Sequence, residues 1–147
     1  MAETKTLDEF RDKFRVEELL IFSNEHWSWS VRPSQPTLGS GVISLNRYAL
    51  TLGDVTSGEM RSLAYVIARA EKNVKRRFNH NIMNYLALMM VDHHVHYHVI
   101  PRYEGTRIFS DLEWVDNGWP VLPLMSDAQH SGSDEVLVQI QKTLSED

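Results

Sequence analysis

The sequence predicts an α+β fold: a mostly antiparallel five-stranded sheet with one long helix packed on a face and a second helix at the C-terminus. Short segments of alternating side chains are typical of strands, a long capped segment repeats apolar residues at helical spacing, and an apolar segment leads into a strand of alternating histidines. The chain has 147 residues, 42% of them hydrophobic and 24% charged. We therefore expect one domain, 1–147, with a substantial core.

The first half of the chain predicts a short helix and three strands. Residues 7–14 have the spacing of an amphipathic helix, and residues 16–23 carry a run of large apolar side chains. Residues 26–31 alternate large and small side chains, and residues 41–45 are rich in β-branched types. Two prolines, at 33 and 36, predict a loop between these last two strands.

The long helix is expected to begin after Thr56. Thr56 and Glu59 form a capping-box pattern, in which each side chain accepts a hydrogen bond from the other residue's backbone N–H. Apolar residues then recur at helical spacing as far as Phe78, over about six turns. Lysines and arginines gather in the last turns, which suits the negative end of the helix dipole.

The second half of the chain predicts two more strands and a terminal helix. Residues 81–91 are apolar on both faces, which predicts a strand in the middle of the sheet. Asp92 and His93 are expected to form a tight turn that makes the next strand its antiparallel neighbour. Residues 104–132 show no clear periodicity, and residues 133–145 predict the C-terminal helix.

Composition limits the function classes. The net charge of −5 argues against a nucleic-acid-binding surface, which is usually basic. The absence of cysteine excludes disulfides and thiolate metal sites. The charged N-terminal segment lacks the apolar run of a signal peptide, and no stretch has the length of a membrane span. We therefore expect a cytoplasmic protein without a membrane partner.

Four of the seven histidines lie between positions 93 and 98. On an extended strand His94, His96 and His98 would share one face, because successive side chains point to opposite sides. Three such histidines could bind zinc and leave an open catalytic position, but the outer pair would be about 13 Å apart, too far to share one ion easily. Alternatively, a neutral imidazole could attack an electrophilic phosphorus, with its neighbours as hydrogen-bond donors.

The run His94-Val95-His96-Tyr97-His98-Val99-Ile100 resembles the histidine triad (HIT) motif, His-φ-His-φ-His-φ-φ with φ apolar, at every position. Residues 36–48 resemble the Pro-x-x-Gly-His-x-Leu-Val-x-Pro-x-x-His stretch that precedes the helix in this family. The resemblance covers about residues 16–103 by the order of elements, and 104–147 form a variable C-terminal segment.

The resemblance implies a HIT-like fold and a nucleotide hydrolase or nucleotidyl transferase that acts at the α-phosphate of a nucleotide conjugate, such as a dinucleoside polyphosphate or a phosphoramidate. It implies that His96 is the nucleophile of a covalent nucleotidyl-histidine intermediate and that His94 and His98 support it and contact the phosphate. It also implies a homodimer that shares a sheet across its interface. No metal or other cofactor is required, although a divalent cation can accompany a polyphosphate substrate.

The sequence departs from the family pattern around the expected nucleoside pocket. Ser40 and Tyr48 stand where histidines are usual, and Arg32 falls near the acidic or amide residue that holds the ribose. A guanidinium cannot accept a hydrogen bond from a hydroxyl. The polar Gly-Gln-Ser/Thr-type loop before the triad is replaced by a short, mostly apolar segment. The candidate phosphate-binding residues are therefore Arg32, Ser40 and Arg102.

Trp27 and Trp29 are candidates for a base-stacking wall of the nucleoside pocket. Tryptophans at such positions more often belong to a core or a dimer interface.

Three functions follow from the histidine row: a HIT-type nucleotidyl hydrolase or transferase, a metal-dependent hydrolase using the same histidines, and a nucleotide-binding module without catalysis. The departures around Arg32 and Ser40 keep the third alternative open.

Overall fold

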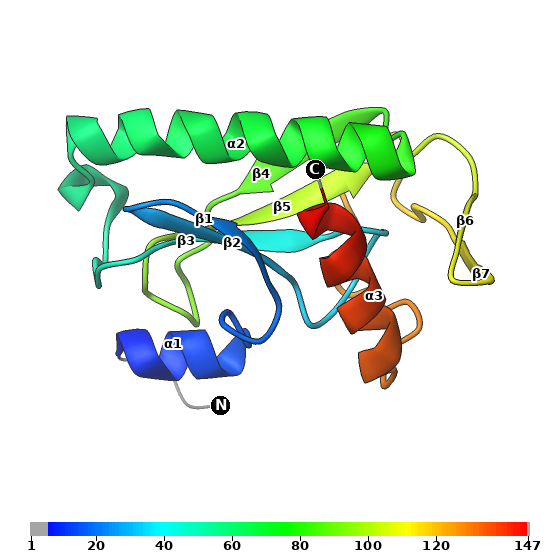
Figure 1. Ribbon diagram of the computed structural model, residues 1–147, viewed down its shortest axis with the longest axis horizontal. Helices are drawn as coiled ribbons and strands as arrows, with labels where there is room; N and C mark the ends of the chain where they lie inside the picture. Colours follow the sequence, from blue (N-terminus) through cyan, green and yellow to red (C-terminus); the bar gives the residue numbers. More distant parts are fainter. Residues whose placement is uncertain (1–5, 147) are drawn as a thin grey trace.

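A five-stranded antiparallel sheet forms the centre of the protein (Figure 1). The computed structural model describes residues 6–146, so residues 1–5 and 147 of the predicted domain lie outside the described part. The order across the sheet is β1-β2-β3-β5-β4, and the predicted α+β fold is confirmed. The strands are β1 (Leu20–Ser23), β2 (Trp27–Val31), β3 (Gly41–Leu45), β4 (Ile82–Leu86) and β5 (His96–Arg102).

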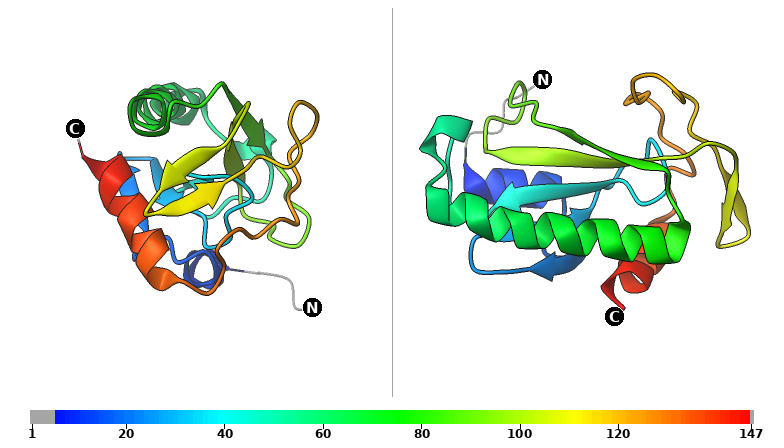
Figure 2. Two further views of the ribbon diagram at one scale, coloured as in Figure 1. Left: turned by 90° about the vertical axis from the view of Figure 1, so that its right-hand side faces the viewer. Right: turned by 90° about the horizontal axis from the view of Figure 1, so that it is seen from above.

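Helix α2 (Ser57–Phe78) runs along one face of the sheet (Figure 2, right). It begins at the predicted capping box, with Thr56 as N-cap and both reciprocal hydrogen bonds to Glu59 present. Asn79 ends it in a left-handed conformation with φ 53°, a geometry that asparagine tolerates better than most residues. Its apolar stripe is buried against a core that contains both Trp27 and Trp29.

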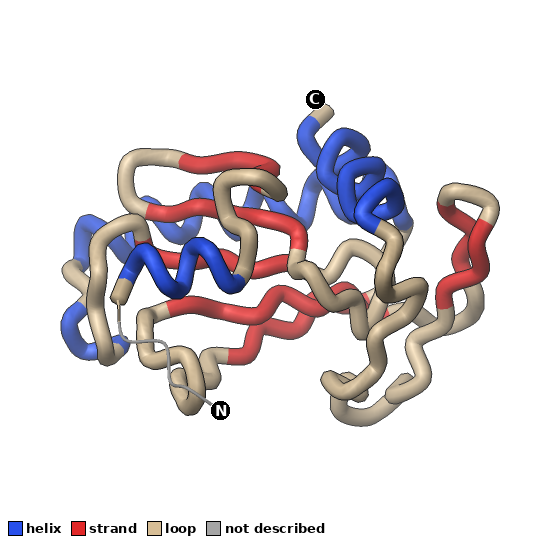
Figure 3. Tube along the Cα trace, turned by 90° about the horizontal axis from the view of Figure 1, so that it is seen from below, coloured by secondary structure: helices blue, strands red, loops and turns tan. Residues whose placement is uncertain are grey.

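Helix α1 (Leu7–Lys13) covers the other face of the sheet, opposite α2 (Figures 1 and 3). Thr6 caps it by accepting a hydrogen bond from the Glu9 backbone. Phe10 is fully buried and Phe14, the residue after the helix, is nearly so. The two rings lie between α1 and the sheet, which fixes this short helix over β3 and β5.

The C-terminal segment packs back on the same core. Helix α3 (Asp134–Ser145) begins after its N-cap Ser133, where the sequence predicts it, and contacts β1, β2 and α2. The segment without periodicity contains a two-stranded hairpin, β6 (Arg107–Phe109) and β7 (Leu112–Trp114), which the sequence analysis missed. A 3-10 turn, η1 (Leu52–Asp54), precedes α2.

Three predicted boundaries are wrong. The first strand begins at Leu20, because the chain forms turns up to residue 19. The strand predicted over 81–91 stops at Leu86 and lies at the edge of the sheet, where Ile82 is 53% exposed. The predicted tight turn at 92–93 is a loop, 87–95, whose apolar side chains line a cavity instead of continuing the strand.

No helix within residues 6–146 combines the length and the apolar character needed to cross a membrane.

Candidate active site

The three triad histidines lie on the α1 side of the sheet. His96 and His98 belong to β5, and His94 lies in the bend before it, so the predicted row is only partly on a strand. The Phe10 ring is 4.9 Å from the rings of both His94 and His96, and the His96 and His98 rings are also 4.9 Å apart. The histidines therefore form one cluster beneath α1.

The backbone holds both ring nitrogens of His94. Its Nε2 lies 2.7 Å from the Leu45 carbonyl oxygen, which can only accept, and its Nδ1 lies 3.3 Å from the Ala49 backbone N–H, which can only donate. His94 is therefore neutral, with its proton on Nε2. Neither nitrogen is available to a phosphate in this arrangement, in contrast to the expectation that His94 contacts one.

His96 has the opposite tautomer. Its Nδ1 lies 2.5 Å from the carbonyl oxygen of His94, so Nδ1 carries the proton and Nε2 carries a lone pair. Nε2 is fully buried and has no hydrogen-bond partner among the described residues. A buried acceptor without a hydrogen bond lowers the stability of the fold. Its lone pair is also available to act as a nucleophile.

His98 is oriented by an arginine. The Arg32 Nε–H donates to its Nδ1 over 3.3 Å, which leaves the proton of His98 on Nε2. His98 thereby presents an N–H donor on a ring whose centre lies 4.9 Å from that of His96. His94 and His98 therefore carry their proton on Nε2, and His96 carries its proton on Nδ1. Of the three histidines, only His96 has an Nε2 lone pair that is free to react.

The surroundings keep all three histidines neutral. Burial is the largest cause that lowers the pKa of His94 and of His96. The pKa of His98 is lowered to about 3, first by burial and then by the nearby His96 and Arg32. A neutral imidazole at ordinary pH is the form that a nucleophilic mechanism needs.

Helix α1 covers the nucleophile. Rings of Phe10 and Phe14 lie 4.9 and 5.8 Å from the His96 ring, and His96 has no exposed surface. Lys13 contacts both carboxylate oxygens of Asp92 at 2.8 Å, which joins the end of α1 to the loop 87–95. A substrate phosphorus can therefore reach Nε2 only when α1 or its side chains move.

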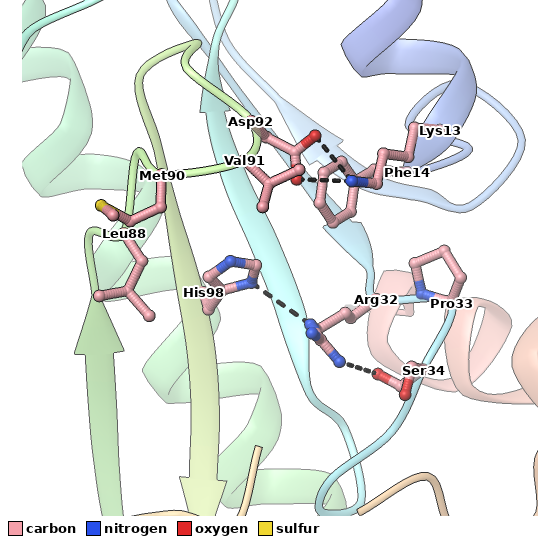
Figure 4. Close-up of a pocket in the computed structure, with 10 residues that line it drawn as sticks. All are labelled: Lys13, Phe14, Arg32, Pro33, Ser34, Leu88, Met90, Val91, Asp92 and His98. Carbon is pink, nitrogen blue, oxygen red and sulfur yellow. Dashed lines mark hydrogen bonds and ion pairs between the residues drawn. The ribbon is translucent and has the colours of Figure 1, made fainter. Parts of the chain in front are cut away.

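A cavity of about 460 Å³ opens beside His98, between α1, the loop after β2 and the loop 87–95 (Figure 4). One side carries the polar groups of Arg32, Lys13 and Asp92. The other is apolar and includes Leu88 and Met90. This volume lies within the usual range for small-molecule sites. The lining residues are Lys13, Phe14, Arg32, Pro33, Ser34, Leu88, Met90, Val91, Asp92 and His98.

The structure brings one of the predicted phosphate-binding residues, Arg32, to this cavity. Ser40 is fully buried in the turn before β3, where its hydroxyl donates to the Thr37 carbonyl. Arg102 is buried at the far end of β5 and pairs with Asp116 through two hydrogen bonds, of 2.7 and 3.2 Å. These two residues have structural partners and do not line the cavity.

The predicted base-stacking tryptophans also lie elsewhere. Trp27 and Trp29 have no exposed surface and belong to the core between the sheet and α2. The Trp27 Nε1–H donates to the Glu59 carbonyl over 2.8 Å. The strand parity explains this placement, because β2 pairs with β3 so that both indoles point away from the histidine face.

The apolar side of the cavity was missed by the sequence analysis. Phe14 was assigned to an amphipathic helix and Leu88 and Met90 to a central strand, so none was considered near the histidines. The repeat of Phe10 and Phe14 at positions i and i+4 did indicate one buried helix face. Which surface that face covers depends on the path of the chain after the helix.

Within residues 6–146, no group of three or more histidine or acidic side chains is arranged to hold a metal ion. The hydrogen bonds of His94 and His98 agree with this. Both nitrogens of His94 are engaged, and those of His98 are divided between Arg32 and the cavity.

Comparison with solved structures identifies the fold. A histidine triad protein from Bradyrhizobium japonicum superposes with a TM-score of 0.66 at 19% identity, over 98% of this chain and 96% of that one. The chain has the histidine triad fold. A hypothetical histidine triad nucleotide-binding protein from Sulfolobus tokodaii gives a TM-score of 0.65 at 17% identity, over 86% and 80% of the two chains.

A zinc-bound histidine triad family protein from Mycobacterium smegmatis shares the fold with a TM-score of 0.59 at 16% identity, over 86% of this chain and 84% of that one. No protein-family model matches the sequence. No curated protein matches it either. The histidine triad fold is therefore supported by structural similarity, at 16–19% sequence identity to these three structures.

Proposed function

We propose that this protein is a nucleotide hydrolase or nucleotidyl transferase that acts at the α-phosphate of a nucleotide conjugate. The observation that supports it most is the buried, unpaired Nε2 of His96, whose tautomer is set by the His94 carbonyl. The neighbouring cavity has both a cationic and an apolar side, which suits a phosphate joined to a nucleoside. The histidine triad fold, shared with a hypothetical nucleotide-binding protein, also supports a nucleotide ligand.

The first step transfers the nucleotidyl group to the enzyme. The Nε2 lone pair of His96 attacks the α-phosphorus, an N–P bond forms, and the bond from phosphorus to the leaving group breaks with its electron pair on the leaving group. The imidazole becomes positively charged, and the His94 carbonyl stabilises this charge because it accepts the Nδ1 proton in a hydrogen bond. The Nε2–H of His98 can donate to the phosphoryl oxygens.

The second step releases the nucleotide. A water or another acceptor attacks phosphorus, the N–P bond breaks, and the electron pair returns to Nε2 of His96. The proton lost by the attacking water goes to the departed leaving group or to solvent. These steps need no metal or cofactor, so we propose that none is required.

The test is AMP release from a diadenosine polyphosphate, an adenosine phosphoramidate and adenylyl sulfate, each with and without chelator. We expect chelator-resistant release from at least one donor, lost in His96→Ala and retained in the control His26→Ala, which lies outside the cavity. Mass spectrometry of an alkaline-quenched reaction should find one nucleotidyl group on His96. No release from any donor would contradict the proposal. Loss of release on chelation would favour the metal-dependent alternative, which the zinc-bound structural neighbour makes worth testing.

A non-catalytic nucleotide-binding module is the second candidate function. The observation that favours it is the complete burial of His96 beneath Phe10 and Phe14. A protein of this kind would bind nucleotide without cleaving it, and its affinity for nucleotide would be unchanged in His96→Ala. Isothermal titration with AMP on both proteins separates the two functions.

We also propose that the protein is a homodimer with a sheet shared between subunits. Among the strands within residues 6–146, β4 pairs with β5 alone and so lies at the edge of the sheet, where its outer side can accept a further strand; Ile82 on it is 53% exposed. Sedimentation equilibrium should give twice the chain mass of 17.0 kDa. A monomer at micromolar concentration would contradict this proposal, and Ile82→Lys should weaken the dimer.

A further inference from the structure

Arg32 differs from Lys13 in the same cavity and from Arg102 at the far end of β5, because no carboxylate among residues 6–146 accompanies it. Its guanidinium lines the cavity, and burial is the one cause that shifts its pKa, downward from its ordinary value. Lys13 in the same cavity is paired with both oxygens of Asp92, and Arg102 with those of Asp116. A partly desolvated guanidinium without an anion is unfavourable.

The hydrogen bonds of Arg32 occupy only part of its donor fork. Nε donates to Nδ1 of His98, and Nη1 donates to the Ser34 carbonyl over 2.9 Å. Nη2 has no hydrogen bond within residues 6–146, although a guanidinium has five N–H donors in a fixed plane. Two neutral acceptors therefore hold a side chain that lines the cavity, and its Nη2 donors have no partner within residues 6–146.

Arg32 lies on the Nδ1 side of the His98 ring, away from its Nε2. In Figure 4 the Nδ1 of His98 faces Arg32, and its other ring nitrogen points toward the end of the cavity with Val91 and Asp92. The two nitrogens of an imidazole point in diverging directions. A phosphoryl group bound to Nε2–H of His98 and attacked by His96 is therefore not the group that best meets Arg32.

We propose that the cavity binds a substrate with two anionic groups, and that Arg32 binds the second one, separate from the phosphoryl group attacked by His96. This inference rests on the proposed function. The second group is a phosphate, sulfate or carboxylate, because a guanidinium binds such planar or tetrahedral oxyanions through paired N–H donors. A neutral ribose alone would leave the guanidinium unpaired.

The second anion can lie on the nucleoside side or on the leaving-group side of the attacked phosphorus. Adenosine 2′,5′-bisphosphate and adenosine 3′,5′-bisphosphate place it on the ribose, and ADP places it beyond the α-phosphate. AMP carries the first anion alone and serves as the baseline. The ligand that gains most over AMP identifies the side.

The experiment is isothermal titration of these four nucleotides into the full chain. We expect at least one doubly anionic ligand to bind about tenfold more tightly than AMP, the gain expected for a charge-assisted hydrogen-bond pair. Arg32→Gln should abolish this gain. Because the substitution also removes the hydrogen bond that orients His98, the gain is read as the ratio of doubly anionic ligand affinity to AMP affinity within each variant. Arg32→Lys keeps the charge without the fork and should retain part of the gain. Arg61→Gln, an exposed position on α2, removes the same charge elsewhere and should retain all of it.

Two results would overturn the inference. An equal loss of AMP and bisphosphate affinity in Arg32→Gln leaves their ratio as in wild type and would mean that Arg32 does not bind a second anion. No gain of any doubly anionic ligand over AMP, with AMP bound and AMP release intact, would mean that the second site does not exist. If no nucleotide binds at all and no donor is cleaved, the proposed function itself fails, and this inference fails with it. Circular dichroism of each variant shows that the fold is retained.

Discussion

Removing Asp116 should destabilise the protein strongly without changing what it binds. Asp116 and Arg102 are 6% and 4% exposed, and the carboxylate accepts two hydrogen bonds from the guanidinium. It also accepts from the backbone N–H groups of Tyr103 and Gly118, each at 3.1 Å. Asp116→Ala leaves a buried guanidinium and two backbone donors without this acceptor.

The magnitude follows from this geometry. Breaking a buried ion pair by removing one partner costs about 3–5 kcal/mol, because the remaining charge is buried without compensation. For a chain of this size each kcal/mol lowers the melting temperature by about 2–4 °C, so Asp116→Ala should melt at least ~6 °C below wild type. The double variant Arg102→Met, Asp116→Leu removes both charges and should recover much of the loss, since an apolar replacement of a buried pair is often close to neutral.

The assay is urea unfolding monitored by tryptophan fluorescence, together with titration of AMP below the unfolding transition. Equal AMP affinity in wild type and Asp116→Ala would agree with a structural role of the pair at the far end of β5. A loss of stability below about 1 kcal/mol would refute the reasoning about burial. A selective loss of AMP affinity in the folded double variant would refute the separation of Arg102 from the binding site.

Three further predictions concern the histidine cluster. The pKa of His98 is about 3 in the folded protein, whereas the unfolded chain takes up this proton near pH 6.5. The free energy of unfolding should therefore be highest above pH 6.5 and fall by up to about 1.4 kcal/mol per pH unit below it. Urea unfolding at several pH values should find a smaller slope in His98→Gln. Lys13→Met removes a half-exposed ion pair, so acylation of His96 by diethylpyrocarbonate should accelerate by at most about fivefold, and an unchanged rate would mean that the phenylalanine rings alone hold α1. His94→Ala leaves a buried carbonyl and N–H unpaired and should cost about 1–3 kcal/mol in thermal unfolding, whereas an unchanged stability would contradict its positioning role.

Local patterns in the sequence predicted most of the framework correctly. The capping box at Thr56 and the apolar spacing behind it define α2, and Ser133 likewise marks the start of α3. Strand β3 has its predicted bounds, 41–45. These features depend on hydrogen bonds and side-chain periodicity within one element, so the local sequence carries the information.

The predicted site was only partly brought together by the structure. Arg32 and the triad histidines converge, whereas Ser40 and Arg102 have buried partners, and Trp27 lies in the core. The sequence could not show that Arg102 is paired with a carboxylate whereas Arg32 is not, because both positions are simply arginine. That difference depends on Asp116, fourteen residues away along the chain from Arg102 and brought back by an irregular segment.

The sequence by itself determined the alternation of His94, His96 and His98, the capped helix and the order of the elements, because each follows from contacts between residues near one another in the chain. Tertiary structure decided the tautomers of His94 and His98, the burial of His96 under α1 and the exposure of Arg32 to a cavity. Each of these depends on a partner from a distant segment: Ala49 for His94, Phe10 for His96 and Arg32 for His98. Packing places those partners, and no local pattern encodes them.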